Sequence, residues 1–555
     1  MRRDFCYNEC VMFKFPYQVV KLIKALKEHQ FEAYVVGGAV RDIMLGKLPH
    51  DYDIATSASP EDAIAIAKEH GWQTVDKLGK NFGTIIVVVN GMGMEVTTFR
   101  GERYDKDSHR PAEIWKARNL QEDCKRRDFT VNAMAMDLQG ILYDFNGGRK
   151  DLENQVLRTV GKAKKRFSED ALRMFRACRF VAELGFDYVD ENSKTHKFGD
   201  PNSEYYLPRC PVFDVSRCDG LSVERVKAEL EKLFCGDFAG KGLAMLMGTG
   251  LATAKCQVKK NGEVKVVDIL PELKHLVGLK QNPKFHFYDA WEHTLRAIDN
   301  SPSKLAIRWA LVCHDIGKGM PGVRDINKEG QPRDSGHEKQ SAVMTAELLQ
   351  RLNYAPKFVK YVTFLVAHHM RFAAFMRDDH NGIKAEKSML HWLRDVVSEN
   401  LFKHETDLAD ACTDLVKLYL ADMGATVAGR NAAIMAEGRE MGAQLIQLAR
   451  TRMPISTGDL NLKAQDIEKI PANINVKNAL TYLVHRVQSG DLVNEHTALM
   501  KALFAKYERL EKKKHEQDVE NRPARAGAGG VRRRTRTVKK SSTSVGKQRG
   551  DGKCQ

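Results

Sequence analysis

The sequence predicts an α/β head with a small mixed sheet, followed by an all-helical neck, body and tail and a disordered basic extension. Short strand-like runs alternate with helical patterns up to about residue 140, whereas nearly all later apolar patterns have helical spacing. From residue 511 onward there are 14 lysines and arginines against 5 aspartates and glutamates, a composition that cannot bury a core. We therefore expect a head at 1–140, a neck at 141–255, a body at 270–420, a tail at 425–510 and a disordered extension at 511–555.

Composition narrows the class of protein further. With 555 residues, 43% of them hydrophobic, the chain is long enough for several domains. A formal net charge of +16 favours a polyanionic partner. The 11 cysteines include no CxxC pair, which is typical of free thiols in a reducing compartment. No run of 18 apolar residues and no signal peptide is evident, so we expect a cytoplasmic protein without a membrane span.

The first motif is a glycine pair between a strand and a helix. Residues 31–36 read as a short buried strand, Gly37 and Gly38 end it, and residues 39–45 begin a helix. Such a turn lets backbone N–H groups approach a phosphate, and the helix N-terminus favours its negative charge. An isolated glycine pair is usually only a turn, so this motif indicates a phosphate site only in combination with other polar residues nearby in the chain.

Asp51 and Asp53 follow the glycine turn. Two residues apart on a strand, they would lie on one face, where their charges repel unless a cation lies between them. Oxygen ligands suit Mg²⁺, and a phosphate-binding turn followed by such a pair is what nucleotidyl transfer requires. The alternative is a solvated loop. Glu95, on the second strand of a hairpin expected at 84–100, is either a third acidic group or part of a surface pairing.

Two later segments carry arginines. Arg126 and Arg127 either begin a charged helix or hold phosphate and sugar oxygens, which guanidinium groups match well. The run 166–180 predicts a helix capped by Ser168. One face of this helix either forms surface ion pairs or reads the donor and acceptor edge of a base. The side chains spaced along that face are Asp170, Arg173, Arg176 and Arg179.

Taken in order, these motifs resemble the class II CCA-adding tRNA nucleotidyltransferases of the DNA polymerase beta-like superfamily. The resemblance covers residues 31–186 and resumes at 220–235. It rests on Gly37-Gly38, Asp51-x-Asp53, Arg126-Arg127-Asp128, Glu169-Asp170-x-x-Arg173 and Ser222-Val223-Glu224-Arg225. That family adds C, C and A to tRNA 3′ ends without a nucleic-acid template.

The resemblance implies a role for each motif. Asp51 and Asp53 would be the catalytic residues and the Mg²⁺ ligands. The nucleotide would be bound by Gly37, Gly38, Arg41, Arg126 and Arg127. Glu169, Asp170 and Arg173 would act as a protein template for the incoming base, supported by Arg176 and Arg179.

The sequence departs from the family pattern in two places. At the end of the head, Asp144 is followed by Phe145 and Asn146 where the family usually has Pro-Phe-Gly-Gly. Residues 187–219 contain three prolines and cannot form the continuous helix that we would otherwise expect. We interpret this segment as an inserted loop.

A histidine-aspartate pair in the body indicates a second candidate metal site. His314-Asp315, within the run 311–318, resembles the HD phosphohydrolase superfamily. Nitrogen and carboxylate ligands of this kind bind a divalent transition metal or Mg²⁺. The resemblance leaves two alternatives, a metal-dependent phosphohydrolase site or an HD fold kept as a structural body. The candidate ligands are His293, His314, Asp315, His337, His368, His369 and Asp410, of which His368 and His369 compete for one role.

The sequence therefore predicts an enzyme, a CCA-adding tRNA nucleotidyltransferase that uses Mg²⁺ and has tRNA, CTP and ATP as partners. The alternatives are an enzyme that adds only CC or only A, a poly(A) polymerase, and an inactive RNA-binding protein. The presence of both Asp51 and Asp53 argues against the last. The tail at 425–510 would grip tRNA, and the basic extension would neutralise phosphates.

Overall fold

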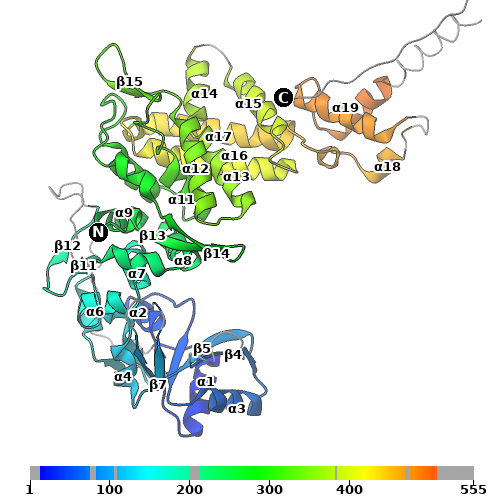
Figure 1. Cartoon of the computed structure of the whole chain (residues 1–555). Helices are drawn as coiled ribbons and strands as arrows, with labels where there is room; N and C mark the ends of the chain where they lie inside the picture. Colours follow the sequence, from blue (N-terminus) through cyan, green and yellow to red (C-terminus); the bar gives the residue numbers. More distant parts are fainter. Residues whose placement is uncertain are drawn as a thin grey trace, which may run out of the picture.

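The computed structural model describes residues 13–75, 83–104, 109, 111–199, 213–381, 384–468, 470, 474–506 and 508. The basic extension at 511–555 and residues 200–212 of the expected insertion lie outside this part of the chain. Figure 1 shows the head at one end, the large helical region at the other and the neck helices between them. Among the described residues, none of the helices combines the length and apolar character needed to cross a membrane.

The head is built on one mixed sheet, as the sequence predicts. Its seven strands run in the order β3-β4-β5-β2-β1-β8-β9, and only β2 and β5 pair in parallel. The strands are β1 (Ala33–Val36), β2 (Asp53–Thr56), β3 (Gln73–Val75), β4 (Thr84–Val89), β5 (Met92–Thr98), β8 (Met134–Met136) and β9 (Leu142–Asp144). The helices of the head are α1 (Tyr17–Glu28), α2 (Gly38–Met44), α3 (Pro60–Glu69) and α4 (Leu120–Lys125), and a hairpin of β6 (Arg100–Arg103) and β7 (Glu113–Lys116) lies beside the sheet.

Local sequence signals explain several of these boundaries. Ser59 and Asp62 form a reciprocal capping box at the start of α3, with Pro60 in the first turn. The hairpin of β4 and β5 turns at Asn90 and Gly91, both with positive φ. The second of these elements agrees with the hairpin expected at 84–100.

The prediction of one continuous helix at 166–180 is wrong. The structure has two helices, α6 (Ala163–Glu169) and α7 (Leu172–Leu184), separated at Asp170, whose backbone is extended. The Asp170 carboxylate accepts a hydrogen bond from the Leu172 N–H, a local bond that competes with helix continuation and starts α7. Ser168 caps neither helix, because its hydroxyl donates to the Lys165 carbonyl.

The neck continues with short elements. They are α5 (Gly148–Glu153), β10 (Val156–Arg158), β11 (Asp187–Val189), β12 (Thr195–His196), α8 (Val223–Phe234) and α9 (Ala239–Gly248). The described part of the expected insertion contains β11, β12 and a 3₁₀ turn, so it is not one helix. A hairpin of β13 (Lys255–Lys260) and β14 (Glu263–Asp268) projects from the neck in Figure 1.

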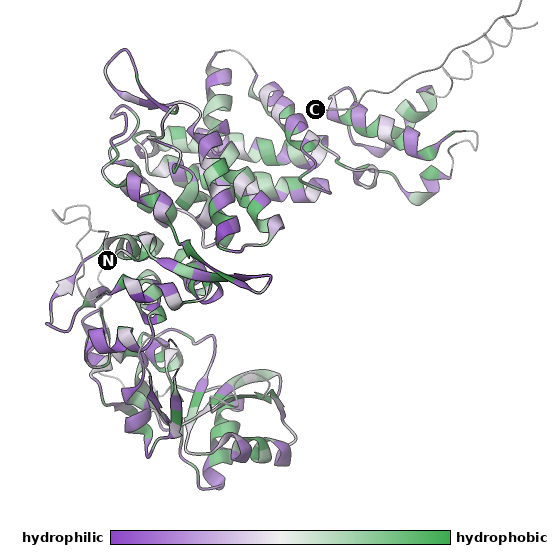
Figure 2. Cartoon of the chain, viewed as in Figure 1, coloured by the Kyte–Doolittle hydropathy of each residue, from purple (hydrophilic) through white to green (hydrophobic). Residues whose placement is uncertain are grey.

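The second half is largely helical. Its helices are α10 (Ala290–Asp299), α11 (Leu305–Cys313), α12 (His337–Arg351), α13 (Pro356–His368), α14 (Arg371–His380), α15 (Ala385–Ser398), α16 (Glu405–Gly424), α17 (Ala432–Arg452), α18 (Ala464–Ile467) and α19 (Val476–Gln488). A hairpin of β15 (Arg324–Ile326) and β16 (Pro332–Asp334) precedes α12. Hydrophilic and hydrophobic residues alternate along these helices in Figure 2, as expected for helices that bury one face.

Most of the buried apolar residues form one continuous cluster that runs from the head to α17, and a second, smaller cluster around Phe99 and Ala135 lies in the head. A separate small cluster, which includes Leu483 and Leu499, holds the last helices together. The head, neck and helical body therefore share a packed interior, whereas the tail has a core of its own.

Candidate functional site

The glycine turn of the head faces the predicted acidic and basic residues. Gly37 has a φ of +74°, a conformation that favours glycine. A side chain at this position would begin 3.4 Å from Arg127 Nη1 and 3.5 Å from Asp53 Oδ2. The structure thus brings the turn, Asp53 and Arg127 together at the ends of β1 and β2.

Three carboxylates lie near this turn. The parallel register of β2 and β5 pairs Asp53 with Glu95, and Asp51 precedes β2 by two residues. Burial, then Glu95, then Asp51 raise the pKa of Asp53 to about 6, while Arg127 lowers it. Glu95, which the sequence left open between two interpretations, therefore lies close enough to influence Asp53. Oxygen donors that repel one another in this way fit a hard divalent cation such as Mg²⁺.

Arg126 and Arg127 are held by an aspartate that sequence reasoning missed. Asp123 is fully buried, and its carboxylate lies 2.8 Å from Arg126 Nη2 and 3.1 Å from Arg127 Nη2. Arg126 also pairs with Glu102 at 3.1 Å. Burial raises the pKa of Asp123, but Arg127 and Arg126 outweigh it and hold this pKa below its ordinary value. Asp123 thus fixes both guanidinium groups, and its position one helical turn before them was the available signal.

The predicted template residues converge on the break between α6 and α7. Glu169 accepts from Arg166 at 2.8 Å and from Arg173 at 2.5 Å. Asp170 pairs with Arg225 of α8 at 2.6 Å. These side chains are 10–32% exposed, so they are not a row of solvated surface ion pairs.

Arg176 and Arg179 continue this charged face along α7. Arg176 pairs with Asp128 of the head at 2.6 Å, and Arg179 lies 3.3 Å from Glu229 of α8. Sequence reasoning gave Glu229 no role and quoted Asp128 only as part of a motif. Ion pairs across the head and neck are long-range pairings that spacing along the chain does not reveal.

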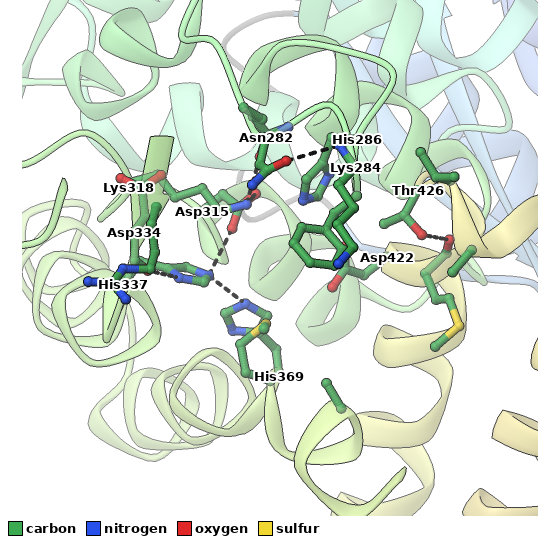
Figure 3. A pocket seen from close by; sticks show the side chains of 18 of the residues that line it. Asn282, Lys284, His286, Asp315, Lys318, Asp334, His337, His369, Asp422 and Thr426 are labelled. Carbon is green, nitrogen blue, oxygen red and sulfur yellow. Dashed lines mark hydrogen bonds and ion pairs between the residues drawn. The ribbon is translucent and has the colours of Figure 1, made fainter. Parts of the chain in front are cut away.

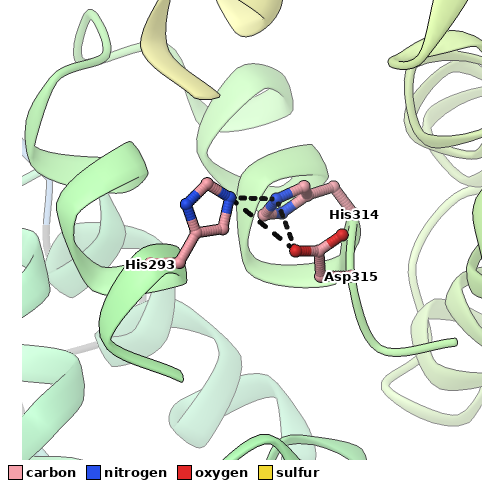
Figure 4. Close-up of side chains that lie close together, drawn as sticks. All are labelled: His293, His314 and Asp315. Carbon is pink, nitrogen blue, oxygen red and sulfur yellow. Dashed lines mark hydrogen bonds and ion pairs between the residues drawn. The ribbon is translucent and has the colours of Figure 1, made fainter. Parts of the chain in front are cut away.

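A second cluster lies in the helical region. Figure 4 shows His293, His314 and Asp315 facing one another, and Figure 3 shows Asp315, His337 and His369. The ligand atoms of each of these two groups lie within 4.8 Å of one another, and all five residues are buried. The contacts are His293 Nε2 to His314 Nε2 (3.3 Å), His314 Nε2 to Asp315 Oδ2 (3.2 Å), His337 Nε2 to Asp315 Oδ1 (3.2 Å) and His337 Nε2 to His369 Nε2 (3.2 Å).

Backbone carbonyls fix the orientation of these imidazoles. The Nδ1 atoms of His314, His337 and His369 lie 2.7–2.8 Å from the carbonyl oxygens of Leu311, Asp334 and Val366. Because a carbonyl can only accept, each Nδ1 donates, and each Nε2 points toward the centre of the cluster, where an imidazole in its neutral form offers a lone pair. Both oxygens of Asp315 are buried without a well-formed hydrogen bond. Converging Nε2 atoms and an unsatisfied carboxylate are a donor set that fits a divalent transition metal.

Two of the residues predicted for this site lie elsewhere. Asp410 is exposed, and the carboxylate at the cluster is Asp422, whose Oδ1 lies 2.9 Å from His293 Nε2. Both are on α16, but a separation of twelve residues turns their side chains about 120° apart around the helix axis. His368 accepts a hydrogen bond from Trp392 Nε1 at 3.1 Å. Of the two neighbouring histidines, it is therefore His369 that lies in the cluster.

A pocket of about 720 Å³ opens beside this cluster. Phe285, Met370 and Lys284 line it together with four residues of the site, Asp315, His337, His369 and Asp422. His286 also lines it, and burial, then Lys318, lower the pKa of this imidazole to about 3, so it is neutral at physiological pH. Lys318 Nζ lies 2.8 Å from Asp315 Oδ2. Part of the cluster therefore borders a cavity large enough for a small-molecule ligand.

Comparison with known families gives two matches. Residues 33–158 match the family described as the poly A polymerase head domain, and residues 286–413 match the HD domain. The first range contains the glycine turn and the carboxylates. The second contains all the cluster residues except Asp422.

Comparison with individual proteins agrees with these matches. The CCA-adding enzyme of Geobacillus stearothermophilus is 45% identical over 303 residues, which are 54% of this chain and 64% of that protein. The CCA-adding enzyme of Bacillus pumilus is 36% identical over 294 residues, which are 51% of this chain and 68% of that protein. The match thus spans just under two thirds of the first relative and slightly more of the second.

A solved structure extends the likeness. The crystal structure of the Bacillus stearothermophilus CCA-adding enzyme in complex with CTP is similar with a TM-score of 0.54 at 28% identity. That likeness covers 89% of this chain and 98% of the solved chain. It includes the helical region as well as the head.

Proposed function

The chain belongs to the family of CCA-adding enzymes, and we therefore propose that it adds C, C and A to the 3′ end of tRNA from CTP and ATP. The observation that carries this proposal is the meeting of Asp53, Glu95 and Arg127 at the Gly37 turn. A carboxylate pair beside a phosphate-sized turn and a guanidinium group suits nucleotidyl transfer.

In the proposed mechanism, Asp51 and Asp53 would hold Mg²⁺, and the ion would supply charge neutralisation for the triphosphate and the attacking 3′ oxygen. Gly37 and Gly38 let the backbone approach the phosphates. Arg127, fixed by Asp123, orients a phosphate or sugar oxygen, and Arg126 and Arg41 add to this group.

The residues at the break between α6 and α7 select the base in this proposal. Glu169 and Asp170 present carboxylates in partly exposed positions, and Arg173 adds a guanidinium group that is largely buried beside them. These groups match the edges of cytosine and adenine. Their present ion pairs with Arg166 and Arg225 hold them in place without a nucleotide. The incoming base therefore meets side chains whose positions are already fixed.

We assign one role to each part of the chain. The head, residues 1–140, carries out catalysis, and the neck, 141–255, selects the nucleotide and contacts RNA. Residues 270–420 form the HD domain, and the tail, 425–510, binds tRNA. The extension at 511–555 adds positive charge for tRNA binding. Full CCA addition is favoured over addition of CC or A alone because one template contains both acidic and basic side chains.

Nucleotide incorporation tests the proposal. Transcripts of one tRNA ending before the CCA, after C and after CC are incubated with CTP and ATP, and the products are sequenced. We expect additions of three, two and one nucleotides. Products ending at CC or lacking C would establish partial addition, and a long run of A would establish poly(A) synthesis.

A second activity is favoured by the histidine cluster. We propose that His293, His314, Asp315, His337 and His369, together with Asp422, bind a divalent transition metal for phosphoester hydrolysis. The metal would act as a Lewis acid on a phosphoryl oxygen, and Lys318 would hold a second oxygen of the same group. Measurement of bound metal after dialysis, and of hydrolysis of p-nitrophenyl phosphate, separates this activity from a purely structural HD fold.

A further inference from the structure

Phe180, on α7, lies against three guanidinium groups from two parts of the fold. The Cζ atoms of Arg179, Arg176 and Arg41 lie 4.1, 5.4 and 5.5 Å from the centre of its ring. Arg41 belongs to α2 of the head, whereas the other two belong to α7. The ring is 4% exposed, and its edge packs on Phe129, with ring centres 5.5 Å apart. One phenyl ring thus joins cations of the head and the neck.

The arginines are also fixed at their edges. Oxygen partners hold each guanidinium group: Asp42 (2.8 Å) and Asn132 (2.8 Å) hold Arg41, Asp128 (2.6 Å) holds Arg176, and Glu229 (3.3 Å) lies beside Arg179. Arg179 Nε is buried between Glu229 and Glu183, at 3.3 and 3.6 Å, without a well-formed hydrogen bond. The cluster is therefore held in place by its carboxylate partners.

The ring contributes what a further carboxylate could not. Its face attracts a guanidinium group through the quadrupole and carries no charge, so the cations keep their charge and their outward N–H groups. The planar guanidinium groups held in this way match the spacing of phosphate oxygens. The cluster borders the glycine turn, because a side chain at Gly38 would begin 3.5 Å from Arg41 Nη2.

We propose that Phe180 is a positioning residue that gathers Arg41, Arg176 and Arg179 into one cradle for the polyphosphate of the incoming nucleotide. This inference rests on the proposed nucleotidyl transfer. It assigns Arg176 and Arg179 to phosphate, and it leaves the base edge to the residues at the break between α6 and α7. It also makes the contact between the head and the neck part of nucleotide binding.

The test compares two Phe→Leu variants of one helix. Phe180→Leu removes the ring face and keeps an apolar side chain. Phe175→Leu is the matched control, since Phe175 is 1% exposed on α7 and no arginine of the described residues stacks on it. Binding of inorganic triphosphate is measured by calorimetry with the full-length protein, and KM and kcat are measured for CTP and ATP.

We expect Phe180→Leu to raise the Kd for triphosphate and the KM for both nucleotides about tenfold, equivalent to about 1.4 kcal/mol. The ratios of kcat/KM for CTP over UTP and for ATP over GTP should stay unchanged. Phe175→Leu should change the triphosphate Kd less than twofold. Thermal unfolding of both variants reports the packing cost, and Phe180→Met replaces Phe180→Leu if the latter does not fold.

Equal changes of the triphosphate Kd in the two Leu variants would overturn the proposal. So would a loss of base discrimination in Phe180→Leu at an unchanged triphosphate Kd, which would place the arginines at the base. Failure of the proposed function has a different signature, a wild-type protein that incorporates no nucleotide. Triphosphate calorimetry needs no turnover and tests the cradle in that case as well.

Discussion

The two acidic centres of this chain have carboxyl groups whose pKa values are shifted in opposite directions. In the head, burial and the neighbouring carboxylates raise the pKa of Asp53 to about 6. In the helical region, burial also raises the pKa of Asp315, but His314 and Lys318 outweigh it and hold this pKa well below its ordinary value. The sign of the surrounding charge decides the outcome in each case.

This difference separates two kinds of metal chemistry. The head offers oxygen donors that need a cation to be ionised together, which suits Mg²⁺ arriving with a nucleotide. The helical cluster offers imidazoles whose Nδ1 atoms are already fixed by backbone carbonyls. Such a preorganised nitrogen site suits a resident transition metal. We infer that the two centres work independently.

The largest expected effect is the loss of nucleotide incorporation in Asp53→Ala. Several kcal/mol of charge neutralisation would be lost at the transition state, so turnover with CTP and with ATP should fall at least about a thousandfold. Single-turnover incorporation into a tRNA lacking CCA measures this loss. Affinity for tRNA should change less than a few fold, and near-normal turnover in Mg²⁺ would show that the carboxylates are not the catalytic centre.

The next effect is on metal bound at the helical cluster. Asp422→Ala should weaken transition-metal binding at least about 100-fold, since even partners of metal ligands contribute 10–100-fold. Asp410→Ala is the control on the same helix and should retain the metal. Elemental analysis after dialysis distinguishes them. Equal metal content in the two variants would contradict the assignment of Asp422, and both should still add nucleotides.

Much of the head could be predicted from the sequence, because its signals are local. The strand, glycine turn and capped helix near residue 60 follow from neighbouring residues. The break at Asp170 was missed because a single side-chain bond to the Leu172 N–H decides it. In the second centre, Asp422 was missed because the helical register of α16 relative to α10, not sequence spacing, brings it to His293.

Base selection should respond more modestly than catalysis. Asp170→Asn keeps an acceptor for the Leu172 N–H but changes the edge offered to a base. We expect discrimination against UTP and GTP to fall by about 1–3 kcal/mol. Asp62→Asn, at the start of α3, is a control for the same substitution at a helix cap. An equal decline for all four nucleotides would instead assign Asp170 to an ion pair with Arg225.

The last expected effect is on stability and involves no catalysis. Because the folded-state pKa of Asp53 is above its ordinary value of 3.8, its ionised form destabilises the metal-free head above pH 6. Asp53→Asn should stabilise the protein by up to about 3 kcal/mol at pH 8, and by about half of this at pH 5, where the folded wild type is largely protonated. Unfolding in EDTA at the two pH values measures this gain. A gain that is the same at both values would mean that Asp53 is not under repulsion.

The independence of the two centres is tested most directly by incorporation with one metal at a time. Wild-type protein is stripped of transition metals with a chelator, dialysed, and supplied with Mg²⁺ alone and a tRNA lacking its 3′ CCA. The account predicts complete CCA addition at the rate of the untreated protein, with no hydrolysis of p-nitrophenyl phosphate. Loss of addition that only a transition metal restores would contradict it, because the head carboxylates would then not suffice for the reaction.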